Sequence, residues 1–211
     1  MRYIVKAVVA ALMPMVQSLS AQIQSSPQIS VEKVQTVVQK HDNRLDEIEQ
    51  YSRRDNVVLR GVAEDAGEST NQRVMEIAAA AGVTVTEANI STSHRVGRPQ
   101  PNKTRPIIAR FVRRDLRTDL LRNKRKLKDT SSKDVMVGEH LSPGRAKLLQ
   151  IVKQDENTEK VWTIDGRINC TLKNDPQRKK FVISSPEDLF RQLGWKEDKL
   201  KQSGLFVDIR A

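Results

Sequence analysis

The chain has 211 residues and a net charge of +11, with 37% apolar, 30% charged and 4% aromatic residues. This length allows one or two small domains, and the low apolar content argues against a large enzyme core. The single cysteine, Cys170, excludes a disulfide framework, and His41, His94 and His140 are too far apart in sequence for a local zinc motif. We therefore expect no metal and no cofactor.

Positive charge is concentrated in one stretch. Residues 91–133 hold 14 Lys or Arg against three Asp, an excess equal to the whole net charge. This one-sided excess indicates a polyanionic partner, because each neutralised phosphate releases a condensed counterion. A solvated helix face is the alternative. The sequence shows no glycine-rich phosphate loop and no nucleophile-elbow serine, so it predicts no catalytic residue and no enzyme.

The first segment, residues 1–27, is the least informative. Arg2 and Lys6 flank an apolar stretch over residues 7–16, which has the form of a secretory signal and is too short to span a bilayer. We do not expect secretion of a basic chain with one cysteine, nor a membrane partner. A mis-started reading frame is an alternative explanation of this segment.

Residues 28–54 are predicted to form a coiled-coil helix that Pro27 bounds upstream. Apolar residues recur there at heptad spacing over about three heptads, with His41 in one of the positions: Val31, Val34, Val38, Leu45 and Ile48. We favour self-association through this stripe. Packing of the helix against the chain's own domain is the alternative.

Residues 55–141 predict a compact α+β domain. Strands are expected at 56–62, 90–96, 106–112 and 134–139, and helices at about 70–81 and 114–128. The order is β-α-β-β-α-β, which is the ferredoxin-like, split βαβ arrangement. In that arrangement both helices cover one face of the sheet and the other face is open.

Strand alternation predicts which side chains occupy the open face. Val58 and Arg60 of the first strand should lie there, as should Ile108 and Arg110 of the third. The two strands are neighbours in this arrangement, so we expect Arg60 and Arg110 to lie close together. Guanidinium groups stack on bases and pair with phosphates. Ordinary surface ion pairing is the alternative.

A smaller α+β unit is predicted over residues 142–195. Ser142 and Pro143 start a helix, and Asp165-Gly166 is a two-residue turn joining strands at 161–164 and 167–172. A strand at 181–184 and a helix from Ser185 to Gly194 complete the unit. Residues 196–211 are expected to form a loosely held tail.

Several ordered motifs suggest a family. The runs Glu49–Asn56, Leu59–Val62, His94–Gly97 and Arg105–Phe111, followed by 121–128, 162–168 and 181–189, resemble the RNA-binding protein of the first open reading frame of LINE-type retrotransposons. The resemblance covers roughly residues 45–195. It implies an RRM-like domain and a C-terminal domain that together bind RNA, and a coiled coil that usually forms trimers. Family members with full assembly have a much longer coiled coil.

The resemblance implies RNA contacts at Arg110, Arg122, Arg125, Lys128, Arg167 and Lys180. With the basic residues of the open face, the loop 98–105 and the basic helix, the predicted RNA-binding set also contains Arg60, Arg98, Arg105, Arg113 and Arg117. The expected partners are RNA, single-stranded DNA and further copies of the chain, in cytoplasmic or nuclear ribonucleoprotein particles. The expected function is RNA packaging and chaperone activity of low sequence specificity. The alternative is an interaction module whose basic helix docks an acidic protein.

Overall fold

The computed structural model describes residues 2–101 and 103–196 and contains two units, which divide between Leu45 and Asp46. The fold is mixed α and β with two antiparallel sheets, so the predicted α+β class is confirmed. The predicted tail at 196–211 lies outside the described residues, except for Lys196.

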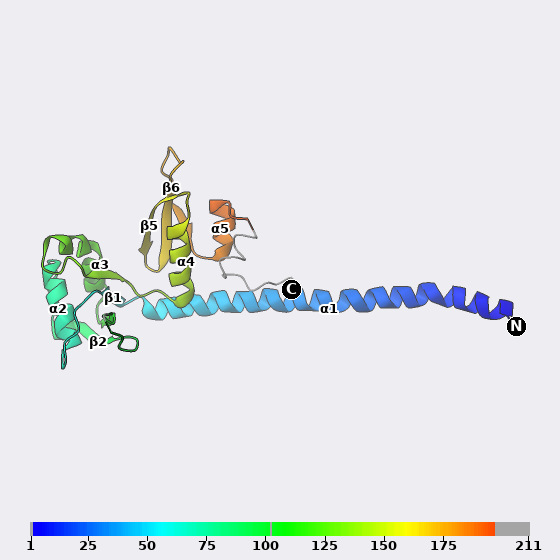
Figure 1. The fold of residues 1–211 in the computed structure, drawn as a ribbon, viewed down its shortest axis with the longest axis horizontal. Coiled ribbons are helices and arrows are strands. Elements are labelled where there is room, and N and C mark those ends of the chain that lie inside the picture. The colour runs from blue at the N-terminus through cyan, green and yellow to red at the C-terminus, as the bar shows by residue number, and fades with distance from the viewer. Residues whose placement is uncertain (1, 102, 197–211) are drawn as a thin grey trace. The chain divides into compact units, whose positions relative to one another are not determined.

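The first unit consists of most of helix α1 (Arg2–Arg53), drawn from blue to cyan in Figure 1. The prediction that Pro27 bounds this helix is wrong, because α1 continues through Pro14 and Pro27. A proline removes one N–H from the helix ladder and crowds the carbonyl oxygen of residue i−4, which weakens a helix without always ending it. The predicted heptad residues are exposed in the single chain, at 50% for Val31, 60% for Val34, 50% for Val38, 63% for Leu45 and 59% for Ile48.

The apolar start of α1 is not a hydrophobic stretch long enough to span a bilayer. This holds for every helix within the described residues, none of which could cross a membrane.

The second unit begins with the last two turns of α1 and contains a four-stranded sheet. Its strands are β1 (Asn56–Arg60), β2 (Ile90–Arg95), β3 (Ile107–Phe111) and β4 (Met136–Glu139), in the order β2-β3-β1-β4 with all neighbours antiparallel. The helical segments are α2 (Thr70–Ala80), η1 (Glu87–Asn89), α3 (Arg114–Asn123) and η2 (Lys124–Asp129). The predicted basic helix at 114–128 is therefore an α-helix followed by a 3₁₀ segment.

The core of this part forms between α2, α3 and one face of the sheet. Alternate strand residues such as Val57, Leu59 and Ile107 are fully buried there, and Val74 of α2 and Leu120 of α3 pack into the same cluster. Period-two alternation in the strands and helical periodicity in α2 and α3 make this layer, because each element buries its apolar side. Val57 and Leu59 therefore face the helices, as strand alternation requires when Arg60 lies on the other face.

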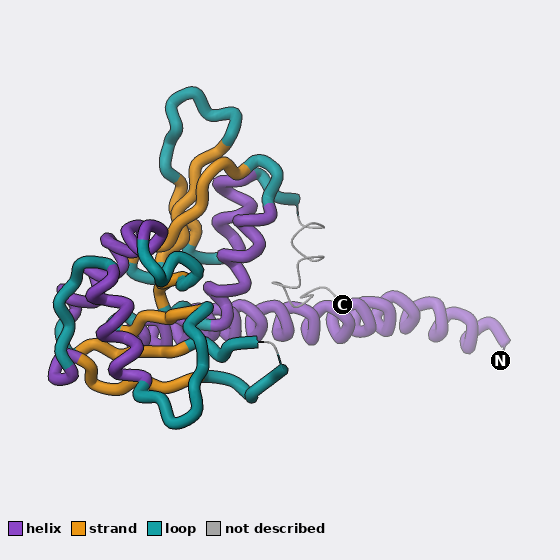
Figure 2. The backbone as a smooth tube through the Cα atoms, turned by 60° about the vertical axis from the view of Figure 1, so that its left-hand side comes forward, coloured by secondary structure: helices purple, strands orange, loops and turns teal. Residues whose placement is uncertain are grey.

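The C-terminal part of the second unit has a sheet of its own. Helix α4 (Pro143–Gln154) is followed by β5 (Thr158–Ile164), β6 (Arg167–Leu172), β7 (Phe181–Ile183) and α5 (Pro186–Leu193), and the sheet order is β5-β6-β7. Asp165 and Gly166 have φ angles of 51° and 76°, as the predicted two-residue turn requires. Figures 1 and 2 show α4 beside this sheet and the β6–β7 loop projecting from it.

Candidate nucleic-acid interface

The face of the four-stranded sheet that is opposite α2 and α3 is basic. The strand register places on it alternate residues of all four strands, which we call the open face: Thr92, His94, Ile108, Arg110, Asn56, Val58, Arg60, Met136, Gly138 and His140. None of these ten is a carboxylate. Arg60 and Arg110 are exposed, and neither pairs with a carboxylate that the structure describes.

The prediction that Arg60 and Arg110 lie close together is wrong, because the register of β1 against β3 separates them. Asn56 is opposite Arg110, and Leu59 is opposite Ile107, so Arg60 lies about four residues further along the sheet. At about 3.4 Å per residue, the two positions are separated by roughly 13 Å along the strands. The antiparallel pairing of β1 with β3 therefore puts the two guanidinium groups at opposite ends of one face.

A groove runs where the open face meets α4 and β5. We call it the groove; it has a volume of about 570 Å³ and is lined by Val58, Arg60, Lys124, Leu149, Lys153 and Trp162, among others. Val58 is only 4% exposed, so the prediction that it is an open surface residue is wrong. The groove combines three cationic side chains, an aromatic ring and apolar walls in a space of ligand size.

Sequence reasoning missed Lys153 and Trp162 as candidate contacts. Trp162 lies in a strand of the C-terminal sheet and Lys153 in the last turn of α4, so neither adjoins the basic stretch in sequence. Both line the groove with Arg60, which belongs to the other sheet. The signal available was Trp162 two residues after Lys160, because aromatic rings beside cations are typical of single-strand binding.

A second hollow, of about 490 Å³, lies on the other side of the Asp165-Gly166 turn. Four arginines line it, together with Tyr51, Glu47, Asp165 and others: Arg54, Arg114, Arg145 and Arg167. The Arg54 guanidinium stacks on the Tyr51 ring at 3.8 Å. Arg114 and Arg145 are engaged by Asp165 and Asp46, whereas Arg167 has no carboxylate partner within the described ranges.

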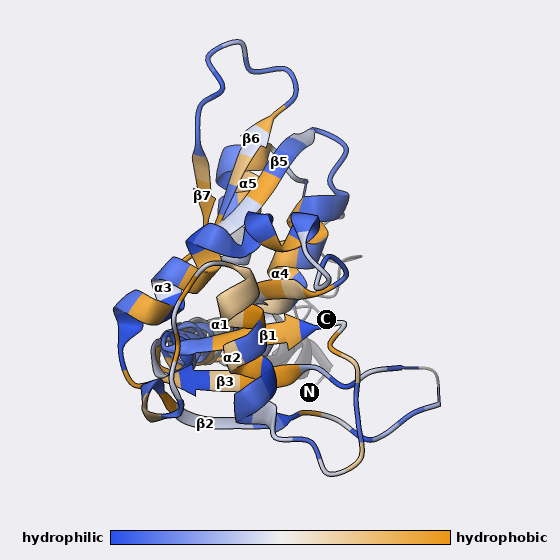
Figure 3. Cartoon of the chain, turned by 90° about the vertical axis from the view of Figure 1, so that its left-hand side faces the viewer, coloured by the Kyte–Doolittle hydropathy of each residue, from blue (hydrophilic) through white to orange (hydrophobic). Residues whose placement is uncertain are grey.

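The remaining predicted contacts are distributed over several elements. Those that are exposed and have no ion pair among the described residues are Arg98 in the β2–β3 loop, Arg125 and Lys128 in η2, and Lys180 in the β6–β7 loop. Figure 3 shows the β6–β7 loop as a hydrophilic segment. Arg122 is 4.0 Å from Asp119, and Arg113 pairs with Asp115. The predicted cations therefore form more than one basic area.

Arg117 does not lie on the exposed side of its helix, contrary to the prediction. Its side chain is 3% exposed, and it pairs with Glu139 at 2.8 Å and with Asp165 at 3.3 Å. A buried guanidinium with two carboxylate partners is unable to reach a phosphate outside. Arg117 is therefore structural in this fold.

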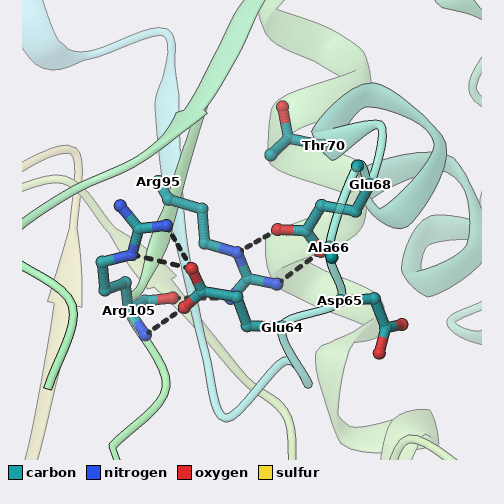
Figure 4. A pocket seen from close by; sticks show the side chains of 8 residues that line it. Glu64, Asp65, Ala66, Glu68, Thr70, Arg95 and Arg105 are labelled. Atoms are coloured by element: carbon teal, nitrogen blue, oxygen red, sulfur yellow. Dashed lines mark hydrogen bonds and ion pairs between the residues drawn. The ribbon is translucent and has the colours of Figure 1, made fainter. Parts of the chain in front are cut away.

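Figure 4 shows how ion pairs hold the β1–α2 loop to β2 and to the β2–β3 loop. The Arg95 side chain is 4% exposed, and its Nε and Nη2 contact the two oxygens of Glu68 at 2.5 and 2.8 Å. Its Nη1 also donates to the carbonyl oxygens of Val62 and Arg105. The hydrogen bonds that Arg95 donates to Glu68 lower the pKa of this carboxyl below its usual range. Arg95 thus joins the β1–α2 loop to the start of β3.

Arg105, a predicted RNA contact, pairs with Glu64 in the same network. The hydrogen bond that Arg105 donates to Glu64 lowers the pKa of the Glu64 carboxyl and raises that of the Arg105 guanidinium. The pair carries no net charge at neutral pH. Arg105 therefore adds little to the attraction of a polyanion while Glu64 holds it.

His140, at the end of the open face, is half-buried and neutral. Burial and the nearby Arg53 cation lower the pKa of His140 to about 4. Arg53 Nη1 contacts Nε2, and an arginine only donates, so Nε2 accepts and Nδ1 carries the proton. Nδ1 lies 3.0 Å from the Asn56 amide nitrogen, while the amide oxygen has no partner. If the oxygen and nitrogen of the Asn56 amide exchange places, the oxygen accepts the hydrogen bond from His140 Nδ1–H, and both of these groups have a partner.

Within residues 2–101 and 103–196, no three His, Cys, Asp or Glu side chains come together as a metal site. No protein-family model matches the chain, and no curated protein matches it.

Proposed function

We propose that this protein binds single-stranded nucleic acid, above all RNA, with low sequence specificity and without a catalytic role. The observation that carries the proposal is the open face and its groove. They combine four cations, Arg60, Arg110, Lys124 and Lys153, with the Trp162 ring. The open face holds no carboxylate, and Glu139, which lines the groove, is paired with Arg117. Cations that follow a phosphodiester chain and an aromatic ring on which a base stacks are the usual parts of such a site.

The proposal includes an RRM-like topology for residues 55–141. The strand order β2-β3-β1-β4 and two helices on one face support it. An ordinary RRM stacks bases on aromatic residues of the central strands. In this chain Arg110 and Arg60 occupy the exposed central positions and the aromatic ring comes from β5, which favours backbone contacts over reading of the bases.

A preference for single strands follows from the groove. Base stacking on Trp162 requires an unpaired base, because the bases of a duplex already stack on one another. Stacking is tolerant of base identity, since every base has a π-face. The same site would therefore accept single-stranded DNA.

We also propose that α1 assembles the protein through its apolar stripe. Five apolar side chains at heptad spacing, each at least 50% exposed in the single chain, support this: Val31, Val34, Val38, Leu45 and Ile48. Assembly would place several binding units on one RNA chain and raise the effective concentration of each. Packaging and chaperone activity of the LINE-type protein that the sequence resembles would need such multivalent binding.

The test is a titration of labelled single-stranded and double-stranded RNA at several salt concentrations. With about four to seven phosphate contacts, the logarithm of the affinity should fall with the logarithm of salt concentration with a slope of roughly −3 to −5. The Arg110→Ala variant should reduce that slope by about 0.7. The matched control is Arg73→Gln, which removes a positive charge on α2 that Asp65 and Glu76 already neutralise.

Absence of RNA binding at low salt, or binding that does not depend on salt, would refute the proposal. A partner captured equally well after nuclease treatment would instead support the acidic-protein alternative. Light scattering should give a mass above that of one chain, and substitution of Val34 and Leu45 by lysine should return it to one chain.

A further inference from the structure

A buried carboxylate connects the two sheets of the second unit. The Glu139 side chain is 5% exposed and lies at the end of β4. Its Oε1 accepts hydrogen bonds from the backbone N–H of Asp165 at 2.8 Å and from Arg117 Nη2 at 2.8 Å, and its Oε2 accepts one from the backbone N–H of Gly166 at 3.0 Å. Three donors from two elements thus converge on one carboxylate.

The contact is reinforced on the side of the turn. The carboxylate of Asp165 accepts from Arg114 at 2.9 Å and from the buried Arg117 at 3.3 Å, so both helix residues hold the turn that Glu139 binds. Glu139 and Asp165 share the charge of Arg117. The Arg117 guanidinium is therefore the centre of a small buried network that joins α3, β4 and the β5–β6 turn.

The end of α1 and the start of α4 enclose the same turn. Gly166 lies against Gln50, so closely that a Cβ at this position would be 2.6 Å from Gln50 Cγ. Gln50 also accepts from the Ser142 N–H at 2.9 Å and donates to the His140 carbonyl oxygen at 3.2 Å. Arg145 donates to the Gly166 carbonyl oxygen at 3.2 Å. The turn is thus held by three elements besides α3.

These contacts lie next to both walls of the groove. Gly138, Glu139 and His140 line it from the first sheet, and Trp162 and Thr163, just before the turn, line it from the second. The hydrogen bonds from Asp165 and Gly166 to Glu139 therefore set the distance between the wall that carries Arg60 and the wall that carries Trp162.

We infer that Glu139 is a positioning residue for nucleic-acid binding, which holds the groove at its binding width through its hydrogen bonds to the Asp165-Gly166 turn. The inference rests on the proposed function. A groove that is already in its binding shape avoids the loss of affinity that a fluctuating one suffers, because the apparent affinity scales with the fraction of molecules that are competent. A negative residue therefore strengthens the binding of a polyanion.

The Glu139→Gln variant separates this role from simple electrostatics. An amide has one acceptor oxygen, so its NH₂ group would face either the Gly166 N–H or the donors at Oε1, and one donor-to-donor contact would loosen the turn. The substitution also makes the protein more positive by one charge, which by itself strengthens RNA binding. A positioning role therefore predicts weaker RNA binding by Glu139→Gln, whereas the change of charge alone predicts tighter binding.

The control is Glu87→Gln, which makes the same charge change at an exposed residue of η1 whose side chain meets Asn71 at 3.4 Å. We expect Glu139→Gln to bind single-stranded RNA about tenfold more weakly than Glu87→Gln, as for a competent fraction reduced to about one in ten. Hydrogen exchange supplies the specific readout. The Asp165 and Gly166 amides should exchange slowly in the wild type, with or without RNA, and quickly in Glu139→Gln.

Equal or tighter RNA binding by Glu139→Gln would overturn the inference, as would rapid exchange of these two amides in the free wild-type protein. If Glu139→Gln does not fold, Gly166→Ala decides, because it pushes the turn away from Gln50 without changing charge and should weaken RNA binding as well. A wild-type protein that does not bind RNA would refute the proposed function, whereas the amide measurement would still report whether Glu139 holds the turn.

Discussion

The burial of neutral His140 should make the stability of the fold depend on pH. Its pKa is lowered from the ordinary value of 6.5 to about 4, first by burial and then by the Arg53 cation. Between pH 6.5 and pH 4, His140 therefore binds a proton in the unfolded chain and stays neutral in the folded chain. The contribution of neutral His140 to the free energy of unfolding is fully present above pH 6.5 and is lost as the pH falls through this window.

The magnitude follows from the shift. A full difference of 2.5 pKa units corresponds to about 3.4 kcal/mol, and at pH 5 about 2 kcal/mol of it would be lost. Solvent screening of a half-exposed ring reduces these values by about half. We therefore expect His140 to cost roughly 1 kcal/mol of unfolding free energy between pH 7 and pH 5.

The assay is urea unfolding at pH 7, 6 and 5, for the wild type and for His140→Gln. Glutamine does not titrate and still offers an oxygen to Arg53, so the variant reports the pH dependence of all other groups. The difference between the two proteins should shrink as the pH falls, because only the wild type loses stability at this site. A difference that is constant over this range would refute the assignment of a neutral, buried His140.

Three other outcomes are expected. Arg117→Ala leaves Glu139 buried without its cation, so urea unfolding should show a loss of about 3 kcal/mol, and a loss below about 1 kcal/mol would contradict the buried network. Burial raises the pKa of Cys170 to about 11, so a thiol reagent at pH 8 should label this residue only on unfolding; rapid labelling of the folded protein would show that the thiol is accessible. Trp162→Leu should weaken single-stranded RNA binding by about 1–3 kcal/mol while Trp162→Phe retains most of it, and equal affinities of the two variants would exclude stacking at this position.

The sequence by itself determined the local elements. The sequence predicted strands at 56–62 and 106–112, where the structure has Asn56–Arg60 and Ile107–Phe111, and Asp165-Gly166 predicted the turn that the positive φ angles confirm. These features depend on residues a few positions apart, whose relation the backbone geometry sets directly.

Only the tertiary structure decided the candidate site. The register of β1 against β3 separated Arg60 from Arg110, and the tertiary fold brought Trp162 of β5 and Lys153 of α4 to the groove beside Arg60. The same packing buried Arg117 between Glu139 and Asp165, residues 22 and 48 positions away from it. Helical periodicity predicts exposure for every lysine and arginine outside the apolar stripe of a helix, so it did not distinguish Arg117 from the other cations of α3. A residue's exposure is decided by the distant surface that packs on it, and local spacing carries no information about that surface.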